Sequence, residues 1–205
     1  MDTFDQYYKK YDFWYEKNKW AYLSELEALK EFIPEDKRGI EIGVGTGRFA
    51  VPLNISLGID PSKKMLEIAR QRGVNTRWGF GEDLPFLNAT FDYVAIIITI
   101  CFADDPLKVL RESKRVLKDE GEIILGVIDK DSFLGKFYQT KESIFYQQAN
   151  FFSVKELEAL LIKIGFNDFV YCQALFQFPD EMKSIERPRE GYGEGGFVVI
   201  KAGKS

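Results

Sequence analysis

Three glycines at alternate positions, Gly43, Gly45 and Gly47, follow a short apolar run in the sequence EIGVGTGRFA, residues 41–50. Glycine can take positive φ values and, having no side chain, lets a ligand touch the main chain. Such a turn after a strand usually serves a bound molecule, often one with phosphate groups near a helix N-terminus. The candidates are a dinucleotide, a nucleoside triphosphate or some other ligand.

The spacing of these glycines counts against the first two candidates. A triphosphate-binding loop has the pattern Gly-x-x-x-x-Gly-Lys-Ser/Thr, but Arg48 and Phe49 stand where its second glycine and lysine should fall. A dinucleotide motif, Gly-x-Gly-x-x-Gly, would need glycine at the position of Arg48. The pattern present is Gly-x-Gly-x-Gly, preceded by the acidic Glu41.

Asp60 is a second candidate for ligand binding, because it ends the apolar run ISLGID. A carboxylate at the tip of the second strand can accept two hydrogen bonds from a ribose diol. The alternative role is a helix N-cap, for which Ser62 is better placed. Asp60 therefore predicts a cofactor that contains adenosine.

The chain contains no histidine, which removes Ser-His-Asp and Cys-His nucleophile systems and imidazole metal ligands. Cys101 and Cys172 lie far apart, without CxxC spacing, and are expected to be buried free thiols. We expect no metal site. Acid–base chemistry must use carboxylate, tyrosine, lysine or water.

Hydrophobic patterning predicts an α/β fold in which strands and helices alternate from Arg38 to about Phe178. This alternation predicts a mostly parallel sheet with helices on both faces. Short apolar runs predict seven strands, at 38–43, 54–60, 74–78, 91–100, 121–128, 166–178 and 195–202. Helical spacing and capping residues predict helices at 18–33, 62–72, 106–118 and 153–165.

Length and charge restrict the domain number and the partners. The 205 residues are enough for one α/β domain, and a net charge of −4 without a long Lys/Arg run argues against a nucleic-acid partner. The chain has no apolar span of 18 residues, and its N-terminus is charged and aromatic. We therefore expect no membrane partner and a cytoplasmic location. The sequence does not indicate the oligomeric state.

Five stretches, in order, resemble the class I S-adenosylmethionine-dependent methyltransferases, in particular the small-molecule group with the methyltransferase type 11 pattern. They are EIGVGTGRFA (41–50), GIDPSKKMLEIARQRG (58–73), GEDLPF (81–86), FDYVAI (91–96) and VLRESKRVLKDEGEIILG (109–126). The resemblance implies a Rossmann-like sheet of seven strands whose last strand, 195–202, is antiparallel. It also implies S-adenosyl-L-methionine as cofactor.

The resemblance assigns roles to eleven positions. The methionine part of the cofactor would lie against the backbone of Gly43, Val44, Gly45 and Gly47, with its ammonium near Glu41 and the main chain of Ile97. Its ribose would be held by Asp60, its adenine ring by Pro61 and Met65, and the adenine edge by Gly81 and Glu82. Two positions depart from the family: Phe80 replaces a frequent Asp or Asn, and Cys101-Phe102 replaces a frequent histidine pair.

Two segments interrupt the alternation, and we interpret them as caps over the site in a single domain, 1–205. They are a helical N-terminal part, 1–33, and an insert, 129–152, that is longer than a usual connection and has Gly135 as a candidate pivot. Their aromatic residues could receive a cationic amine, although ordinary packing would explain them as well. The substrate-binding candidates from these segments and the strand tip are Tyr11, Trp14, Phe102, Phe133 and Tyr138.

Methyl transfer from a sulfonium needs mainly positioning, and an amine that arrives neutral needs no general base. Without histidine, this favours a nitrogen acceptor, for example a small amine of the histamine kind. No residue is assigned to catalysis at this point. Two alternatives stay open: a Rossmann-type NAD(P)-dependent oxidoreductase and a non-catalytic cofactor-binding subunit.

Overall fold

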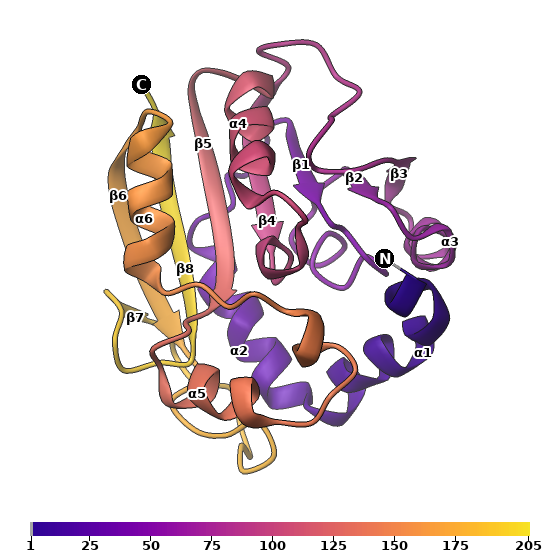
Figure 1. The fold of residues 1–205 in the computed structure, drawn as a ribbon, viewed down its shortest axis with the longest axis vertical. Coiled ribbons are helices and arrows are strands. Elements are labelled where there is room, and N and C mark those ends of the chain that lie inside the picture. Colours follow the sequence, from indigo (N-terminus) through magenta and orange to yellow (C-terminus); the bar gives the residue numbers. More distant parts are fainter. Residues whose placement is uncertain (1) are drawn as a thin grey trace.

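A single twisted sheet organises the chain, and the computed structural model describes residues 2–205 of it (Figure 1). The sheet has eight strands in the order β3-β2-β1-β4-β5-β8-β6-β7. The strands are β1 (Gly39–Ile42), β2 (Leu57–Asp60), β3 (Asn75–Trp78), β4 (Phe91–Ile97), β5 (Leu117–Ile128), β6 (Phe166–Ala174), β7 (Arg189–Glu190) and β8 (Phe197–Lys204). All seven predicted strands are present, and the two-residue β7 was not predicted.

The last long strand, β8, lies between β5 and β6 and runs antiparallel to both. Its register pairs Leu125 with Ile200, so that apolar side chains of β5 and β8 lie directly opposite each other. The pairs β1–β2, β1–β4, β2–β3 and β4–β5 are all parallel. The mostly parallel sheet with a reversed last strand is therefore confirmed.

Helices cover both faces of the sheet, as predicted. The helices are α1 (Asp2–Lys17), α2 (Lys19–Lys30), α3 (Lys63–Gln71), α4 (Pro106–Val116), α5 (Phe133–Thr140) and α6 (Val154–Lys163), with two 3-10 turns, η1 (Ile100–Phe102) and η2 (Tyr146–Gln148). Side chains of α4 and α6 pack in one apolar core, and side chains of α2 and α3 pack in a second core on the opposite face. The central strand β4 is buried from Tyr93 to Ile97 because it has helices on both sides.

Local sequence signals fix the helix starts. Ser62 caps α3 by accepting a hydrogen bond from the Met65 N–H, and Ser153 and Glu156 form a capping box at the start of α6. Helix α4 begins with Pro106 after Asp105, whose side chain accepts from the Lys108 N–H. These helix starts agree with the predicted helices 62–72, 106–118 and 153–165, and Ser62 is the N-cap that the sequence predicted.

Of the two segments interpreted as caps, 1–33 contributes α1 and α2, and 129–152 contributes α5 and η2. Helices α1 and α5 and the turn η2 lie at the end of the sheet toward which β4 and β5 point (Figure 1). Gly135 does not stand in a flexible connection: it lies within α5 and is buried against the carbonyl of Asp129. A Cβ added at Gly135 would lie 2.1 Å from that carbonyl oxygen. The glycine is thus required by a close helix–backbone approach.

We expect Gly135→Ala to lower the free energy of unfolding by about 2–3 kcal/mol, because the added methyl meets backbone, which cannot rotate away. Urea denaturation at neutral pH measures this loss. Gly203→Ala is the matched control, since a Cβ at Gly203 would have its nearest neighbour at an ordinary 3.5 Å. Equal stability of the two variants would contradict the close approach of α5 to Asp129.

Candidate cofactor and acceptor site

A cavity of about 460 Å³ opens at the carboxyl ends of β1, β2 and β4, the edge at which open α/β sheets bind ligands. Its volume lies within the range of small-molecule sites. Its wall is formed by Phe4, Tyr11, Ile42, Gly43, Gly45, Ile59, Asp60, Pro61, Ser62, Met65, Gly79, Phe80, Gly81, Glu82, Ile98, Thr99, Ile100, Phe102, Ala103, Asp104, Val109 and Gln148.

The three glycines of the first motif have different neighbours, although all have positive φ. A Cβ at Gly43 would collide with Thr99 after β4, and one at Gly47 would press on Ala69 and Val74 at the end of α3. At Gly45 the nearest atoms are Met65 Sδ at 3.4 Å and Tyr11 Cε1 at 3.7 Å, both on the cavity wall. Of the three glycines, only Gly45 therefore has open cavity space where a side chain would lie.

Asp60 joins the glycine loop to the start of α3. Its Oδ2 accepts a hydrogen bond from the Gly45 N–H (2.9 Å), and its Oδ1 accepts one from the Ser62 N–H (2.8 Å). The side chain is 8% exposed, and burial raises the pKa of Asp60 to about 6 despite these two donors. Each carboxylate oxygen keeps a second lone pair, so Asp60 can still accept from a ligand in the cavity.

Glu41 lies near Asp60 but not on the cavity wall. Its carboxyl group is 1% exposed, and no described residue hydrogen-bonds its Oε2. Burial, with the neighbouring charge of Asp60, raises the pKa of Glu41 well above its usual value. A buried carboxyl oxygen without a partner is costly, which makes Glu41 a candidate for a ligand or proton partner.

The structure brings nine of the sixteen sequence-predicted site residues together on the cavity wall. These are Gly43, Gly45, Asp60, Pro61, Met65, Gly81, Glu82, Tyr11 and Phe102.

The other predicted residues lie outside the wall. Val44 packs against Gly58 of β2, while the Ile97 carbonyl accepts a hydrogen bond from the Thr99 hydroxyl. Among the aromatic candidates, Trp14 packs on Tyr15, Phe133 on Phe178 and Tyr138 on Tyr146. Glu41 and Gly47 also lie outside the cavity wall.

Sequence reasoning missed several wall residues that come from distant segments. Phe4, Thr99, Asp104 and Gln148 belong to no motif, and only the fold brings them to this edge. Ile98, just after β4, has φ of +48, which is unusual for a β-branched residue. The sequence carries no sign of this turn.

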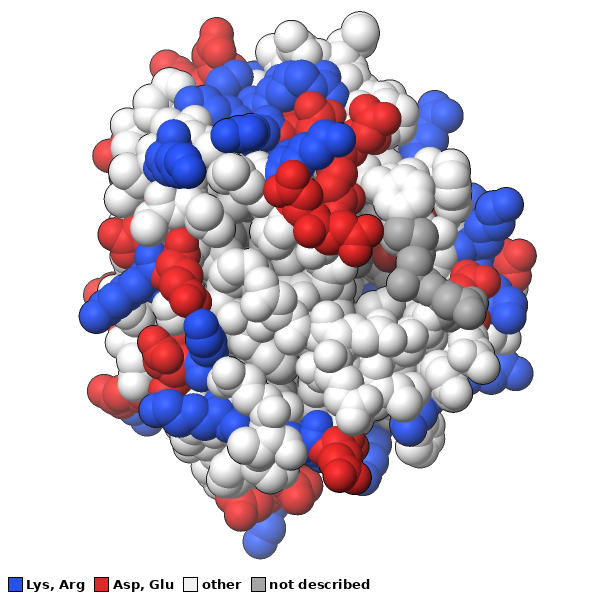
Figure 2. All heavy atoms as spheres, in the orientation of Figure 1, with Lys and Arg blue, Asp and Glu red and all other residues white. Residues whose placement is uncertain are grey.

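Three aromatic rings, Phe4, Tyr11 and Phe102, form part of the cavity wall, and Phe145 packs on Phe4 and Tyr11. Phe4 contacts Phe102, Phe145 and Tyr11, with ring centroids 4.9, 5.4 and 5.8 Å away. Beside them, the Gln148 side chain donates a hydrogen bond to the Thr3 hydroxyl (2.6 Å). Figure 2, which has the same orientation as Figure 1, shows a broad uncharged area with acidic side chains gathered next to it. Glu82 and Asp104 are the acidic residues of the wall that accompany Asp60.

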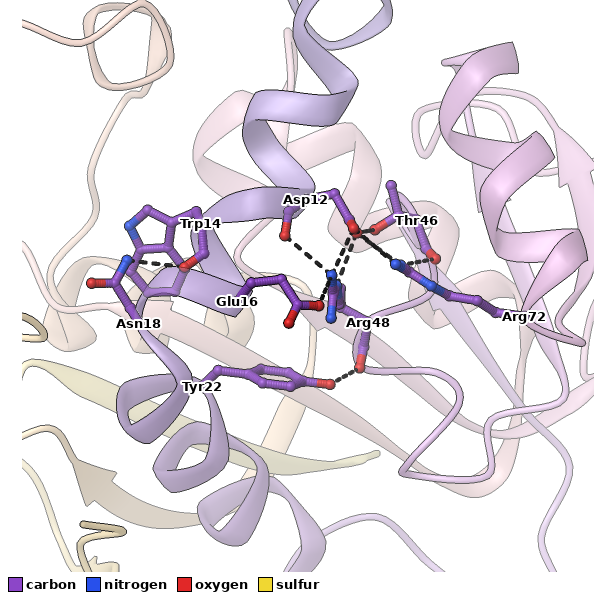
Figure 3. Close-up of polar contacts among 8 residues, drawn as sticks. All are labelled: Asp12, Trp14, Glu16, Asn18, Tyr22, Thr46, Arg48 and Arg72. Atoms are coloured by element: carbon purple, nitrogen blue, oxygen red, sulfur yellow. Dashed lines mark hydrogen bonds and ion pairs between the residues drawn. The ribbon is translucent and has the colours of Figure 1, made fainter. Parts of the chain in front are cut away.

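Asp12 ties α1 to the glycine loop and to α3 (Figure 3). Its carboxylate accepts from Arg48 Nε (2.9 Å) and Nη2 (2.6 Å), from Arg72 Nη1 and Nη2 (both 2.8 Å), and from the Thr46 hydroxyl (2.6 Å). The Asp12 side chain is 17% exposed, and the pKa of Asp12 is held well below its usual range by these donors, against the effect of burial. Helix α1 is thus fixed to the same loop that borders the cavity.

Asp5 makes a second connection from α1. Its Oδ1 accepts from the Ser62 hydroxyl (2.6 Å) and from the Lys64 N–H (3.2 Å), at the start of α3. Ser62 also donates its backbone N–H to Asp60. The cap and the cavity therefore share hydrogen-bond partners.

Comparison with known proteins agrees with this geometry. Residues 40–125 match the family model described as "Methyltransferase domain". A Thermotoga maritima crystal structure, described as a SAM-dependent methyltransferase and possible histamine N-methyltransferase, is 48% identical, covers 98% of both chains and superposes with a TM-score of 0.96. The chain belongs to the class I S-adenosylmethionine-dependent methyltransferases. An uncharacterized Methanocaldococcus jannaschii protein is 50% identical over the full length of both chains.

A more distant relative of this methyltransferase is named for another acceptor, demethylmenaquinone. The demethylmenaquinone methyltransferase of Thermotoga maritima is 33% identical over 156 residues, which cover 67% of this chain and 66% of that protein. Within residues 2–205, no helix combines the length and apolarity needed to cross a membrane. The same residues contain no group of three or more Cys, Asp or Glu side chains arranged to hold a metal ion.

The cavity of the methyltransferase fits its cofactor, S-adenosylmethionine. Gly45 leaves open space beside Met65 Sδ, as a ligand lying against the backbone requires. A largely buried carboxylate, Asp60, stands on the same wall with lone pairs available to hydroxyl groups. The cofactor supplies an activated methyl group, and the chain supplies the surface that orients it.

We expect Asp12→Ala to lower the free energy needed for local unfolding of α1 by about 2–3 kcal/mol. The reason is that Arg48 and Arg72 both lose their ion pair with a largely buried carboxylate. Hydrogen exchange of the α1 amides should then be at least about 30-fold faster at pH 7. The difference should shrink as pH falls below about 4, because a carboxyl with a depressed pKa stabilises the fold only while ionised.

Glu16→Ala is the control, since Glu16 also pairs with Arg48 but its side chain is 62% exposed. Its effect should stay below about 1 kcal/mol. If the α1 amides exchange at the same rate in Asp12→Ala and Glu16→Ala, the contacts of Asp12 do not hold α1 in place.

Proposed function

We propose that this methyltransferase transfers the methyl group of S-adenosylmethionine to the nitrogen of a small amine of the histamine kind. The observation that carries the proposal is the aromatic wall of Phe4, Tyr11 and Phe102 on a cavity whose carboxyl residues, Asp60, Glu82 and Asp104, face no lysine or arginine among the described residues of the wall. Aromatic faces and carboxylates both favour a cationic amine. The description of the Thermotoga maritima protein as a possible histamine N-methyltransferase supports the same acceptor class.

The roles of the wall residues in cofactor binding form part of the proposal. The backbone at Gly43 and Gly45 borders the methionine part, and Asp60 accepts from the ribose hydroxyls. Pro61, Met65 and Phe80 enclose the adenine ring, and the main chain at Gly81 and Glu82 meets its edge. The backbone after Ile97 faces the cofactor's ammonium group, and Glu41, which lies behind the wall, meets that group through water.

The residues of the cavity suit positioning rather than covalent catalysis. The wall offers no cysteine, serine–base pair or lysine as a nucleophile among the described residues, apart from Ser62, whose hydroxyl is used by Asp5. An in-line displacement on an activated methyl needs an acceptor lone pair held about 3 Å away. An amine provides that lone pair once it is deprotonated.

A substrate screen tests the acceptor class. We expect methylation of histamine and related small amines, and no methylation of phenols, carboxylates or quinones, measured by formation of S-adenosylhomocysteine with mass detection of the product. A quinone or phenol product would replace the amine proposal. S-Adenosylhomocysteine should raise the melting temperature and NADH should not, whereas cofactor binding without any methylated product would favour a non-catalytic subunit.

The ionisation of Asp60 gives a pH test of the ribose contact. Because the carboxyl has a pKa of about 6 and accepts hydrogen bonds best when ionised, S-adenosylhomocysteine should bind about tenfold more weakly at pH 5 than at pH 7.5. Isothermal calorimetry measures the dissociation constants. In Asp60→Asn the affinity should be about 1.5–3 kcal/mol weaker at pH 7.5 and should lose this pH dependence. An unchanged affinity in that variant would remove Asp60 from the ribose site.

A further inference from the structure

Glu25 of α2 is the most deeply buried carboxyl group that the proposed site does not use. It is 0% exposed, and neither Oε1 nor Oε2 has a hydrogen-bond partner among residues 2–205. Its helical neighbours at spacings of three and four, Ala21, Ala28 and Leu29, are all core residues, so Glu25 points into the core rather than to solvent. Burial alone raises the pKa of Glu25 to about 8.

Tyrosines from four elements lie within range of the charge of this carboxyl. That charge contributes to the raised pKa values of Tyr11 and Tyr15 of α1, Tyr138 of α5 and Tyr146 of η2, and it opposes ionisation of Tyr22 on its own helix. Other carboxyl groups act on the same tyrosines: Glu41 and Asp60 on Tyr11, Glu41 on Tyr15 and Tyr22, and Asp180 on Tyr138. Among the described residues, no arginine or lysine offsets the burial of Glu25. The ring of Tyr15 packs on that of Tyr22, with centroids 5.2 Å apart, and Tyr22 lies one turn before Glu25 on the same face of α2.

One of these tyrosines reaches the cavity. Tyr11 lies on the cavity wall beside Gly45, and its hydroxyl is 2.7 Å from the hydroxyl of Tyr15. Tyr15 is 3% exposed, and its packing on Tyr22 places it beside the face of α2 that carries Glu25. The exchangeable protons of Tyr11 and Tyr15 therefore lead from the cavity toward a carboxyl in the core.

We propose that Tyr11 and Tyr15 form a proton relay that ends at Glu25, and that this relay deprotonates an ammonium acceptor before methyl transfer. The inference rests on the amine acceptor proposed above. Simple alkyl amines are largely protonated at neutral pH, as the lysine side chain is, and an ammonium has no lone pair to attack a methyl group. The chain has no histidine to accept that proton.

The transfer moves one proton from the acceptor to Glu25 and one methyl group from sulfur to nitrogen. The acceptor N–H gives its proton to the Tyr11 oxygen, Tyr11 gives its own to Tyr15, and Tyr15 gives its own, through one bridging water, to the ionised Glu25. The nitrogen lone pair forms the N–C bond while the methyl C–S bond breaks and leaves its electron pair on sulfur. The products are a methylated ammonium, neutral S-adenosylhomocysteine and protonated Glu25, which returns its proton along the same hydroxyls after product release.

The pH–rate profile tests the relay. With the amine that the screen identifies, kcat/KM of the wild-type protein should rise with pH to an inflection near pH 8, and this inflection should stay when an amine of different pKa is used. In Glu25→Gln we expect kcat to fall about 10- to 100-fold at pH 7.5 and the inflection to vanish. Glu25→Asp should recover part of the rate. Tyr15→Phe should behave like Glu25→Gln.

Two control variants distinguish loss of the relay from a change in packing. Glu27→Gln makes the same change on the outer face of α2, where the side chain is 44% exposed, and should keep the wild-type rate and profile. Tyr22→Phe removes a hydroxyl that donates to the Arg48 carbonyl and lies outside the relay. A wild-type profile in Glu25→Gln, or loss of the inflection in Glu41→Gln alone, would overturn the proposal. If only a non-amine acceptor is found, the amine function fails, and the same variants assayed with that acceptor still decide the relay.

The ionisation of Glu25 can also be measured without the methylation reaction. The pKa of Glu25 in the folded chain lies above the usual 4.5, so ionisation opposes folding and the free energy of unfolding should fall as pH rises from about 5 to 8. Glu25→Gln should flatten this slope, while Glu27→Gln should not. Carbon-13 NMR of the glutamate carboxyls should show a signal titrating near pH 8 that Tyr15→Phe moves upward. If no carboxyl signal moves in Tyr15→Phe, Tyr15 and Glu25 are not coupled.

Discussion

The hydrogen bonds that Asp60 accepts from the backbone of Gly45 and Ser62 hold together the parts of the molecule that form the cavity. One carboxylate at the tip of β2 fixes the glycine loop after β1 and the segment that starts α3. Helix α1 then attaches to the same two places, through Asp12 at the loop and Asp5 at Ser62. The shape of the cavity and the position of its cap therefore depend on a common set of polar contacts, of which those of Asp60 are buried.

This arrangement gives the cap a definite physical relation to the site. The aromatic rings of Phe4 and Tyr11 reach the cavity wall only because α1 is held along the glycine loop. At the other end of the cap, Phe145 and Gln148 meet Phe4 and Thr3 across a large separation in sequence. Two segments with no motif of their own thus add Phe4, Tyr11 and Gln148 to the wall that the glycine turn begins.

Much of the fold could be predicted because each strand carries its own signal. The uninterrupted apolar run of β4 indicates burial on both faces, and the caps at Ser62, Asp105 and Ser153 mark helix starts. The glycine turn and Asp60 were placed at the cavity for the same reason: motif residues at strand ends meet at one sheet edge. β7 has only two residues, too few for any periodicity.

The acceptor side could not be predicted equally well, because its residues are brought together by tertiary packing. Trp14, Phe133 and Tyr138 have the residue types of a binding site, yet they pack on Tyr15, Phe178 and Tyr146. Aromatic residues at helical spacing give no information on which ring faces a cavity and which fills a core. A carboxyl at core spacing, such as Glu25 between Ala21 and Ala28, was a usable signal that the pattern of apolar residues alone concealed.

The internal position of β8 has a consequence for how the chain acquires its structure during synthesis. β6 pairs only with β8 and β7 among the described strands, so it has no place in the sheet until β8 has left the ribosome. The edge of β5 remains open for the same period, with an apolar face that includes Ile123 and Leu125. Completion of the sheet is therefore a late, long-range event, and an incomplete chain exposes an unpaired apolar strand to aggregation.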